Sequence, residues 1–371
     1  MKKIIGICNL HDDPSLGLLT KHRPLGAVTF LGRYALIDFT LSNFTNSHID
    51  RVYVLVKHGV LAMRNHIGSG SIWLNNTKTG SLKLLLNEEG LFKPKFNTDV
   101  ANLKANLDLD SLDFEYAVIA PSFMLSSLDY RPYIEKHEES GADATIIYSH
   151  VENVGDEYVN CDRLKLSPDG RVIKIDTNLG KSKEADISLE SFIVNKKFLK
   201  KIINDSPKIS QMFSLRQLIS YYINEGDAFV RGEKYDGYFI PILDLDHYVS
   251  HSLDLLNYHI RCKLFIEDWP IYTTTHNTPP ALYGKNADVK NSFIANGAII
   301  KGKVANSIIS RDVVIEKGAN VSNCIIFTDT IVGKDVKMKY VLCDKGVQVN
   351  NCKELAGKEG DFLYIEHGVK I

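Results

Sequence analysis

Two adjacent acidic residues, Asp12 and Asp13, follow the apolar run Ile4–Ile7 near the start of the sequence. A protein that binds phosphate groups commonly places a glycine-rich turn after its first strand, because main chain without Cβ atoms can approach the phosphates. Two carboxylates at such a turn could instead ligate a divalent cation. They could also form a polar turn or cap a short helix that begins at Ser15. We predict the turn or cap, since the pair follows Leu10 and precedes a proline.

Further polar side chains with chemical potential follow within a few residues of this turn. Arg23 has the planar guanidinium that recognises phosphate through paired N–H donors. It could therefore contact a phosphate, and the alternative is a solvated or interface side chain. His11 and His22 have no obvious partner in the sequence, and we expect both at the surface.

The order of apolar runs predicts the scaffold that positions these residues. Lys2–Asn9 and Arg51–Gly59 are continuous apolar runs, as in strands that are covered on both faces. Between them, Ile37, Leu41 and Phe44 recur at helical spacing. This pattern predicts a βαβ unit with parallel strands and a right-handed crossover. Further strand and helix patterns alternate up to the linker described below, which predicts an open, doubly wound α/β sheet.

Composition excludes several classes of function. The chain of 371 residues carries 44 Lys and Arg against 45 Asp and Glu, so its net charge of −1 offers no basic groove for nucleic acid. The six cysteines are scattered without a C-x-x-C pair, which predicts buried free thiols in a reducing compartment and no zinc site. The first apolar run is too short for a signal peptide, and no run approaches the ~18 apolar residues of a membrane span. We therefore expect a cytoplasmic protein without a membrane or nucleic-acid partner.

The character of the sequence changes near Trp269, where adjacent prolines and a threonine cluster interrupt the periodicity. Beyond this segment, similar hexapeptides begin at Val289, Val304 and Val321, at offsets of 15 and 17 residues. Such repeats predict a left-handed parallel β-helix with Gly or Asn at each tight corner and about four coils over Phe293–Val349. A small antiparallel sandwich is the alternative. We predict an α/β domain over residues 1–268, a linker over 269–285 and the β-helix over 286–371.

The stretch Tyr34–Ile49 reads YALIDFTLSNFTNSHI and closely resembles a segment of the ADP-glucose pyrophosphorylases, also called glucose-1-phosphate adenylyltransferases. HIGSGSIW from His66, GADATI from Gly141 and the hexapeptide coils extend the resemblance over nearly the whole chain. HRPLGAVTFLGRY, which begins at His22, is similar to the GlgD-type subunits of bacterial glycogen synthesis. The resemblance implies a Rossmann-like, GT-A-like nucleotidyltransferase domain followed by a left-handed β-helix, in a tetramer.

Active members of this family join ATP to glucose 1-phosphate and release pyrophosphate. That chemistry needs a glycine-rich turn, basic side chains and a magnesium ion held by aspartates. The resemblance, laid over this chain without gaps, implies that the lysine of the A-K-P motif falls on Leu25, and the two metal-binding acids on Phe123 and Pro241. The glycine of the sugar-phosphate motif S-M-G falls on Glu190. The G-G-x-G-T-R motif falls on Leu10, His11, Asp12, Asp13, Pro14 and Ser15.

The resemblance therefore implies that this chain keeps the fold and has no catalytic residues. At ~4 Å and an effective dielectric of ~20, each carboxylate of Asp12 and Asp13 would repel a unit of phosphate charge by about 4 kcal/mol. Leucine, phenylalanine and proline cannot ligate magnesium, so we expect no metal or cofactor here and Mg²⁺ only in a catalytic partner. The predicted function is a non-catalytic or weakly catalytic regulatory subunit that enhances a catalytic sister subunit in a heterotetramer.

Three alternatives remain beside this hypothesis. The first is an active glucose-1-phosphate adenylyltransferase with a rearranged loop, in which Arg23 replaces the missing lysine. The second is an acyltransferase, which is disfavoured because no histidine lies between His276 and His367 to act as a general base. The third is a structural scaffold unrelated to glycogen. In addition, Arg23 and Arg33 resemble the region where this family binds phosphorylated effectors, although Ala35 replaces an arginine of many relatives.

Overall fold

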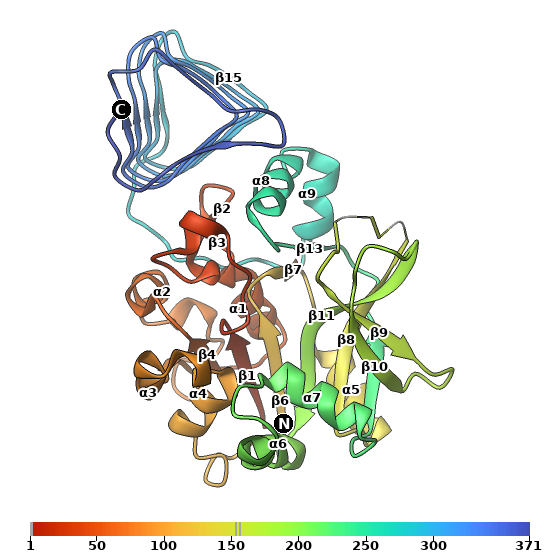
Figure 1. The fold of residues 1–371 in the computed structure, drawn as a ribbon. Coiled ribbons are helices and arrows are strands. Elements are labelled where there is room, and N and C mark those ends of the chain that lie inside the picture. Colours follow the sequence, from red (N-terminus) through yellow and green to blue (C-terminus); the bar gives the residue numbers. More distant parts are fainter. Residues whose placement is uncertain (1–2, 153, 156) are drawn as a thin grey trace.

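The computed structural model describes residues 3–152, 154–155 and 157–371, and Figure 1 shows an α/β domain below a triangular prism. In the α/β domain, β1 (Ile4–Asn9) pairs in parallel with β4 (Arg51–Val56), and α1 (Ile37–Asn46) connects them. The predicted βαβ unit is therefore present. β6 (Tyr116–Pro121) pairs in parallel with β1 on its other side. The order of strands thus reverses between β1 and β6, which is the switch point where open α/β sheets bind ligands.

The remaining strands extend this sheet in both directions. β5 (Ser81–Leu86) pairs with β4, whereas β11 (Glu184–Asn195) is antiparallel to β6 and begins the other half of the sheet. That half also contains β8 (Ala144–Glu152), β9 (Asp162–Leu166), β10 (Val172–Thr177) and β12 (Val230–Lys234). Two short antiparallel pairs lie apart from it: β2 (Thr29–Phe30) with β3 (Tyr34–Ala35), and β7 (Met124–Ser126) with β13 (Phe239–Pro241).

Alternation of side chains along the strands divides the core of the α/β domain into two layers. In β4, Val52 and Val54 face the layer that contains α1. Tyr53 and Leu55 face the opposite layer, which contains α4 (Asp99–Asn106), α6 (Lys196–Ile209) and α7 (Leu215–Asn224). Both faces are therefore covered, as the continuous apolar runs indicate. The other helices are α2 (Val60–Ile67), α3 (Glu88–Phe92), α5 (Arg131–Ser140), α8 (Leu245–Asp254) and α9 (Tyr258–Leu264). Short 3₁₀ helices are η1 (Gly17–Thr20), η2 (Leu25–Ala27), η3 (Ser71–Trp73) and η4 (Pro94–Phe96).

The prism is a parallel β-helix of three five-stranded sheets. The first prism sheet contains β14 (Leu282–Tyr283), β17 (Ile299–Ile300), β20 (Val314–Ile315), β23 (Ile331–Val332) and β26 (Gln348–Val349). The second contains β15 (Asp288–Lys290), β18 (Lys303–Ala305), β21 (Asn320–Ser322), β24 (Lys337–Lys339) and β27 (Glu354–Ala356). The third contains β16 (Phe293–Ile294), β19 (Ile308–Ile309), β22 (Ile325–Ile326), β25 (Val341–Cys343) and β28 (Leu363–Ile365). Because all of these strands pair in parallel, the antiparallel sandwich is excluded.

The corners of the coils explain the repeat seen in the sequence. Asn291, Asn306 and Asn323 have φ of 42°, 47° and 50°, in the left-handed region that asparagine tolerates better than most residues. Tyr340 takes the equivalent corner of the next coil with φ of 53°. The predicted fold class, a Rossmann-like doubly wound sheet followed by a β-helix, is confirmed. Each prism sheet has five strands, and they extend from Leu282 to Ile365, whereas about four coils over Phe293–Val349 were expected.

The third prism sheet faces the α/β domain. Its residues Ile308, Ile325 and Leu342 belong to the same buried cluster as α1 and β1 of that domain. The first prism strand, β14, lies inside the range 269–285 that is predicted as a linker, and it pairs with β17 of the prism. The domain boundaries at residues 268 and 286 stay a prediction. Among the described residues, no helix is long and apolar enough to cross a membrane.

Candidate functional site

The turn after β1 is a buried polar network. His11 is 5% exposed, and its main-chain N–H donates to Asn9 Oδ1 at 3.1 Å. Its ring lies 3.3 Å from the carbonyl oxygen of Asn97 and 2.9 Å from the side-chain amide of Asn102. Burial lowers the pKa of His11 to about 4. The expectation of a surface residue is wrong for His11, because its partners come from α4 and the segment before it, whereas His22 is exposed as predicted.

The two acids of this turn have different environments. Asp12 is exposed, whereas Asp13 Oδ2 accepts a hydrogen bond from Ser122 Oγ at 2.9 Å. Asp13 Oδ1 is buried with no hydrogen-bond partner among the described residues, and burial raises the pKa of Asp13 to about 7. The predicted helix cap is wrong for this pair, because η1 has no such cap and Asp13 points into the domain. Ser15 Oγ instead accepts the N–H of Gly17 at 3.2 Å.

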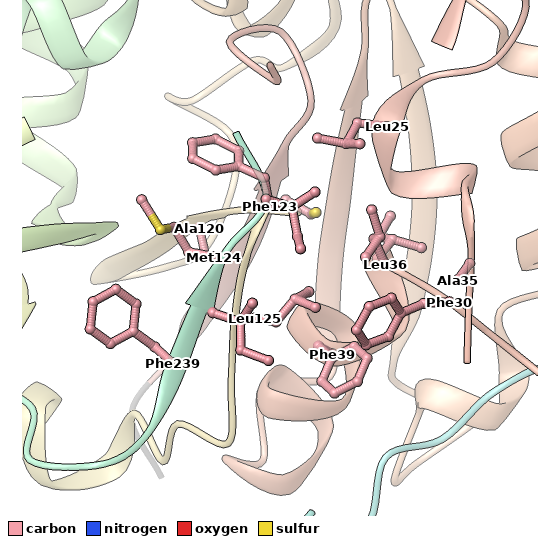
Figure 2. Packing of buried hydrophobic residues seen from close by; sticks show 14 of the residues in the cluster. Leu25, Phe30, Ala35, Leu36, Phe39, Ala120, Phe123, Met124, Leu125 and Phe239 are labelled. Atoms are coloured by element: carbon pink, nitrogen blue, oxygen red, sulfur yellow. The ribbon is translucent and has the colours of Figure 1, made fainter. Parts of the chain in front are cut away.

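The two positions on which the resemblance places metal-binding acids lie side by side. Pro241 is in register with Met124, and Ile242 N–H donates to the carbonyl oxygen of Phe123 at 2.8 Å. Phe123 is 3% exposed and Leu25 is 1% exposed, and both belong to the apolar cluster drawn in Figure 2. Leu25 thus stands where the family has its lysine, and Phe123 and Pro241 stand where the family has its two metal-binding acids. These residues do not fit Mg²⁺, which takes oxygen ligands.

Arg216 fills the crevice beyond the carboxyl ends of β1 and β6. Its Nη1 atom lies 3.1 Å from Glu190 Oε1 and 3.2 Å from Asp162 Oδ2. The cavity that remains has a volume of about 20 Å³, whereas small-molecule sites commonly measure ~300 to 1,000 Å³. The crevice is therefore closed by the chain's own side chains. Its lining includes Asn9, Asp12, Phe123, Glu190 and Arg216.

Glu190 supports the placement of the S-M-G motif. Its φ is 49°, the left-handed conformation in which glycine is least strained, and it lies in a bulge between β11 and β8. The backbone of the motif is thus kept while a carboxylate replaces its glycine. Burial raises the pKa of Glu190 to about 8, and the nearby Arg216 opposes this shift. Among the described residues, no group of three or more His, Cys, Asp or Glu side chains could hold a metal ion.

Arg23 does not face this crevice. Its Nη2 atom lies 2.5 Å from Oδ2 of Asp344 in the β-helix, and the two side chains are 11% and 2% exposed. The hydroxyl of Tyr364 donates to the same oxygen at 2.9 Å. Arg23 Nη1 is buried with no hydrogen-bond partner among the described residues. In this arrangement Arg23 joins the two domains and does not replace the lysine that is missing at Leu25.

A second cavity, of about 730 Å³, lies between the α/β domain and the β-helix. Arg23 and Arg33 both line it, and Arg33 is exposed. Its basic lining residues are Lys21, His22, Arg23, Arg33, His66, His276, Arg311, Lys345 and His367, against Asp312, Asp344 and Glu366. Guanidinium and ammonium groups in excess over carboxylates suit a phosphate or carboxylate ligand. We refer to this space as the interdomain cavity.

Comparison with known proteins agrees with this geometry. Residues 16–175 match the family model described as "Nucleotidyl transferase", and residues 279–359 match "GlmU-like, C-terminal hexapeptide". A glucose-1-phosphate adenylyltransferase of Clostridioides difficile (strain 630) is 30% identical over 324 residues, which cover 85% of this chain and 82% of the relative.

The chain belongs to the glucose-1-phosphate adenylyltransferase family. Another glucose-1-phosphate adenylyltransferase, from Clostridium perfringens (strain SM101 / Type A), is 29% identical over 323 residues, or 85% of this chain and 81% of the relative. The glycogen biosynthesis protein GlgD of Bacillus subtilis (strain 168) is 28% identical over 366 residues, or 96% of this chain and 93% of the relative. The resemblance inferred from the sequence motifs is confirmed.

In this member of the glucose-1-phosphate adenylyltransferase family, the β-helix contributes cations to the interdomain cavity. No motif in the sequence indicated these residues. Arg311, Thr328 and Lys345 line the cavity from successive coils, 17 residues apart in each step (328 − 311 and 345 − 328). The register of the hexapeptides could have placed them at one corner. Burial lowers the pKa of Arg311, and the neighbouring Arg33 lowers it further. Burial also lowers the pKa of Lys345, and the neighbouring Arg23 adds to that shift. Nearby carboxylates, among them Asp312 and Asp344, offset these shifts only in part.

Proposed function

We propose that this chain is a non-catalytic regulatory subunit of ADP-glucose pyrophosphorylase in bacterial glycogen biosynthesis. The observation that carries the proposal is the closed crevice at β1 and β6, whose remaining volume of about 20 Å³ is far too small for ATP. The family relationship supports the reaction, and the relative named GlgD supports the pathway.

The side chains in the crevice support the absence of catalysis. Pyrophosphate can leave only if cations offset the charge that develops on it. Here Arg216 is already paired with Glu190 and Asp162, and Leu25 brings no charge. Asp12 would add repulsion, since a carboxylate near phosphate costs about 4 kcal/mol at ~4 Å and an effective dielectric of ~20. In this proposal, the chain retains the fold through which it contacts a sister subunit, but it does not catalyse the reaction.

The interdomain cavity is the proposed regulatory site. Arg33 and Arg311 come from different domains and both line the cavity, so a bound phosphate would contact the α/β domain and the β-helix together. A phosphorylated sugar suits the cavity, because its size of about 730 Å³ and its excess of cations match a small anion. The coupling between such a site and a catalytic sister is commonly on the order of 1 to 3 kcal/mol.

The test is to co-express this chain with the catalytic glucose-1-phosphate adenylyltransferase of the same organism and to measure ADP-glucose synthesis. We expect a mixed tetramer whose turnover, substrate affinity or effector response differs from that of the catalytic chain alone. The proposal fails if the mixture behaves as the catalytic chain does by itself.

The purified single chain tests the alternative of an active enzyme with a rearranged loop. We expect no pyrophosphate exchange in the presence of Mg²⁺, since neither the loop nor the metal positions fit the substrate. Exchange that is abolished by Arg23→Ala would support the alternative. Exchange that survives Arg23→Ala would also contradict the regulatory proposal, because it would place catalysis elsewhere in this chain.

A further inference from the structure

The corner that follows the third prism sheet has two roles. Residues at equivalent positions of successive coils form two neighbouring columns there, because β19, β22 and β25 pair in register. The first column, which we call the contact column, consists of Ser310, Phe327 and Asp344. The second column consists of Arg311, Thr328 and Lys345, which all line the interdomain cavity. Each residue of the contact column is therefore joined by a peptide bond to a residue that lines the cavity.

The contact column reaches the α/β domain in two different ways. Phe327 packs near Tyr248 of α8, with 6.4 Å between the ring centroids. Asp344 instead makes its contact through the ion pair with Arg23. The difference matters because a guanidinium can exchange its carboxylate partner for another anion, whereas apolar packing offers no such exchange.

The Asp344 carboxylate is an anion that the chain itself supplies to the interdomain cavity. It lines the cavity, and its side chain is 2% exposed. Its Oδ2 atom accepts from Arg23 Nη2 at 2.5 Å and from the hydroxyl of Tyr364 at 2.9 Å. Its Oδ1 atom accepts from the main-chain N–H of Lys345 at 2.7 Å. Donors from the α/β domain and from the β-helix thus converge on one carboxylate, as they would on a bound phosphate.

The cations around this carboxylate are not all satisfied by it. Arg23 Nη1 is buried without a hydrogen-bond partner in the described part of the chain. Arg311 and Lys345 line the same cavity, and neither forms an ion pair with any described residue. A phosphate monoester carries more oxygen atoms than a carboxylate and close to two negative charges at neutral pH. It can therefore accept from donors that Asp344 leaves unpaired.

We propose that Asp344 competes with the phosphate ligand of the interdomain cavity for Arg23, and that a bound phosphate replaces the Asp344 carboxylate at Arg23 and Lys345. This inference rests on the proposed function, in which the cavity binds a phosphorylated sugar. In the ligand-free chain, the ion pair joins the β-helix to the α/β domain. Binding exchanges that pair for contacts to the ligand, so occupancy of the cavity is coupled to the contact between the domains.

The first experiment titrates the isolated full-length chain with sulfate in a calorimeter. Sulfate is the probe because it is tetrahedral like phosphate and keeps its charge throughout the neutral pH range. We expect Asp344→Asn to bind sulfate at least about tenfold more tightly than wild type, because the amide no longer competes for the charge of Arg23. The matched control is Asp312→Asn, which removes one charge from an exposed position of the same cavity and should change affinity by less than about threefold.

A double-mutant cycle shows whether Asp344 acts through Arg23. Arg23→Ala alone should weaken sulfate binding at least about tenfold, since it removes a charged donor. In the Arg23→Ala background, Asp344→Asn should no longer tighten binding, because the contested cation is absent. Damage to the packing between the domains would lower affinity in every variant. A gain of affinity that depends on Arg23 is therefore specific to competition.

Thermal unfolding gives a second measurement that does not depend on the affinity of wild type. Sulfate should raise the midpoint of Asp344→Asn more than that of wild type, because the anion replaces the missing partner of the buried guanidinium. The same addition should affect Asp312→Asn and wild type equally. This comparison stays informative if Asp344→Asn is less stable than wild type, since each variant is compared with itself.

Four outcomes would overturn the proposal. They are Asp344→Asn that binds sulfate no more tightly than wild type, an equal gain in Asp312→Asn, a gain that persists without Arg23, and no sulfate binding by any variant. These titrations use the single chain. Failure of the proposed function would appear separately, as ADP-glucose synthesis by the catalytic sister that is unchanged by this chain.

Discussion

Arg23 and Asp344 are 321 residues apart in the chain, and their side chains form a buried ion pair between the two domains. Tyr364 donates to the same carboxylate oxygen, and Thr330 Oγ1 donates to the carbonyl oxygen of Asp344 at 3.2 Å. Arg23 is one of the two arginines that the sequence marks as phosphate contacts. The ion pair therefore connects the interdomain cavity to the packing of the β-helix on the α/β domain.

Replacement of Asp344 by Asn should destabilise this connection. The change leaves Arg23 as a buried charge without its partner, and breaking a buried pair in this way costs roughly 3 kcal/mol or more. We expect the free energy of unfolding in urea to fall by about that amount. Asp312→Asn is the matched control, since Asp312 lines the same cavity but is exposed, and it should change stability by less than about 0.5 kcal/mol. Equal effects of the two variants would contradict the role of the pair.

Removal of Arg33 or Arg311 should weaken binding of a phosphorylated sugar. A hydrogen bond to a charged group contributes ~1.5 to 3 kcal/mol, so Arg33→Ala and Arg311→Ala should each weaken binding at least about tenfold in calorimetric titration. Arg131→Ala is the control, because Arg131 is paired with Asp129 away from the interdomain cavity. Unchanged affinity in both cavity variants would show that the ligand, if bound, lies elsewhere.

Restoring the missing acids should not restore catalysis. Phe123→Asp combined with Pro241→Asp would bury carboxylates in an apolar cluster, and we expect a loss of stability of several kcal/mol. ADP-glucose synthesis with Mg²⁺ should stay absent, because Arg216 still closes the crevice. Phe123→Leu, which keeps the position apolar, should cost about 1.5 kcal/mol or less. Measurable synthesis by the double variant would mean that the metal positions alone had been lost.

The stability that Asp13 and Glu190 contribute should decrease as pH rises from about 5 to 8. The folded-state pKa values of Asp13 and Glu190 are raised by burial to about 7 and about 8, so each of these two carboxyl groups binds its proton more tightly in the folded chain than in the unfolded chain. Stability from these groups is therefore present at low pH and lost as pH passes their folded-state pKa values. Glu190→Gln should flatten the dependence of unfolding free energy on pH by up to about 1.4 kcal/mol per pH unit. Glu139→Gln, at an exposed position of α5, should leave the slope unchanged.

Several features of this protein follow from sequence because they depend on neighbouring residues. The continuous apolar runs around β1 and β4 predict strands that are covered on both faces, and the structure has them. The hexapeptide repeat predicts a β-helix, because each coil must adopt the same corner at Asn291, Asn306 and Asn323. The absence of glycines from the turn at Leu10–Ser15 and of the lysine at Leu25 is also visible in the sequence, because each motif position can be compared with the residue that occupies it.

Other features depend on residues that are distant in sequence. His11 is buried because Asn97 and Asn102 reach it from another segment, and Asp13 points inward because Ser122 offers it a hydrogen bond. Neither partner is indicated by the sequence around the turn. A polar residue next to a strand is most often solvated, so local reasoning assigns such residues to the surface unless a distant donor or acceptor is known.

The sequence by itself determined the family, the two kinds of fold and the loss of the phosphate turn, because motif residues and repeats are local patterns. Only the tertiary structure decided that Arg216 closes the crevice, that Arg23 pairs with Asp344, and that Arg311 and Lys345 join Arg33 around one cavity. These relationships connect elements up to 321 residues apart, and their energies depend on burial and on distances between side chains. The physical reason is that charge pairing and the volume of a cavity are properties of space, and no spacing along the chain specifies them.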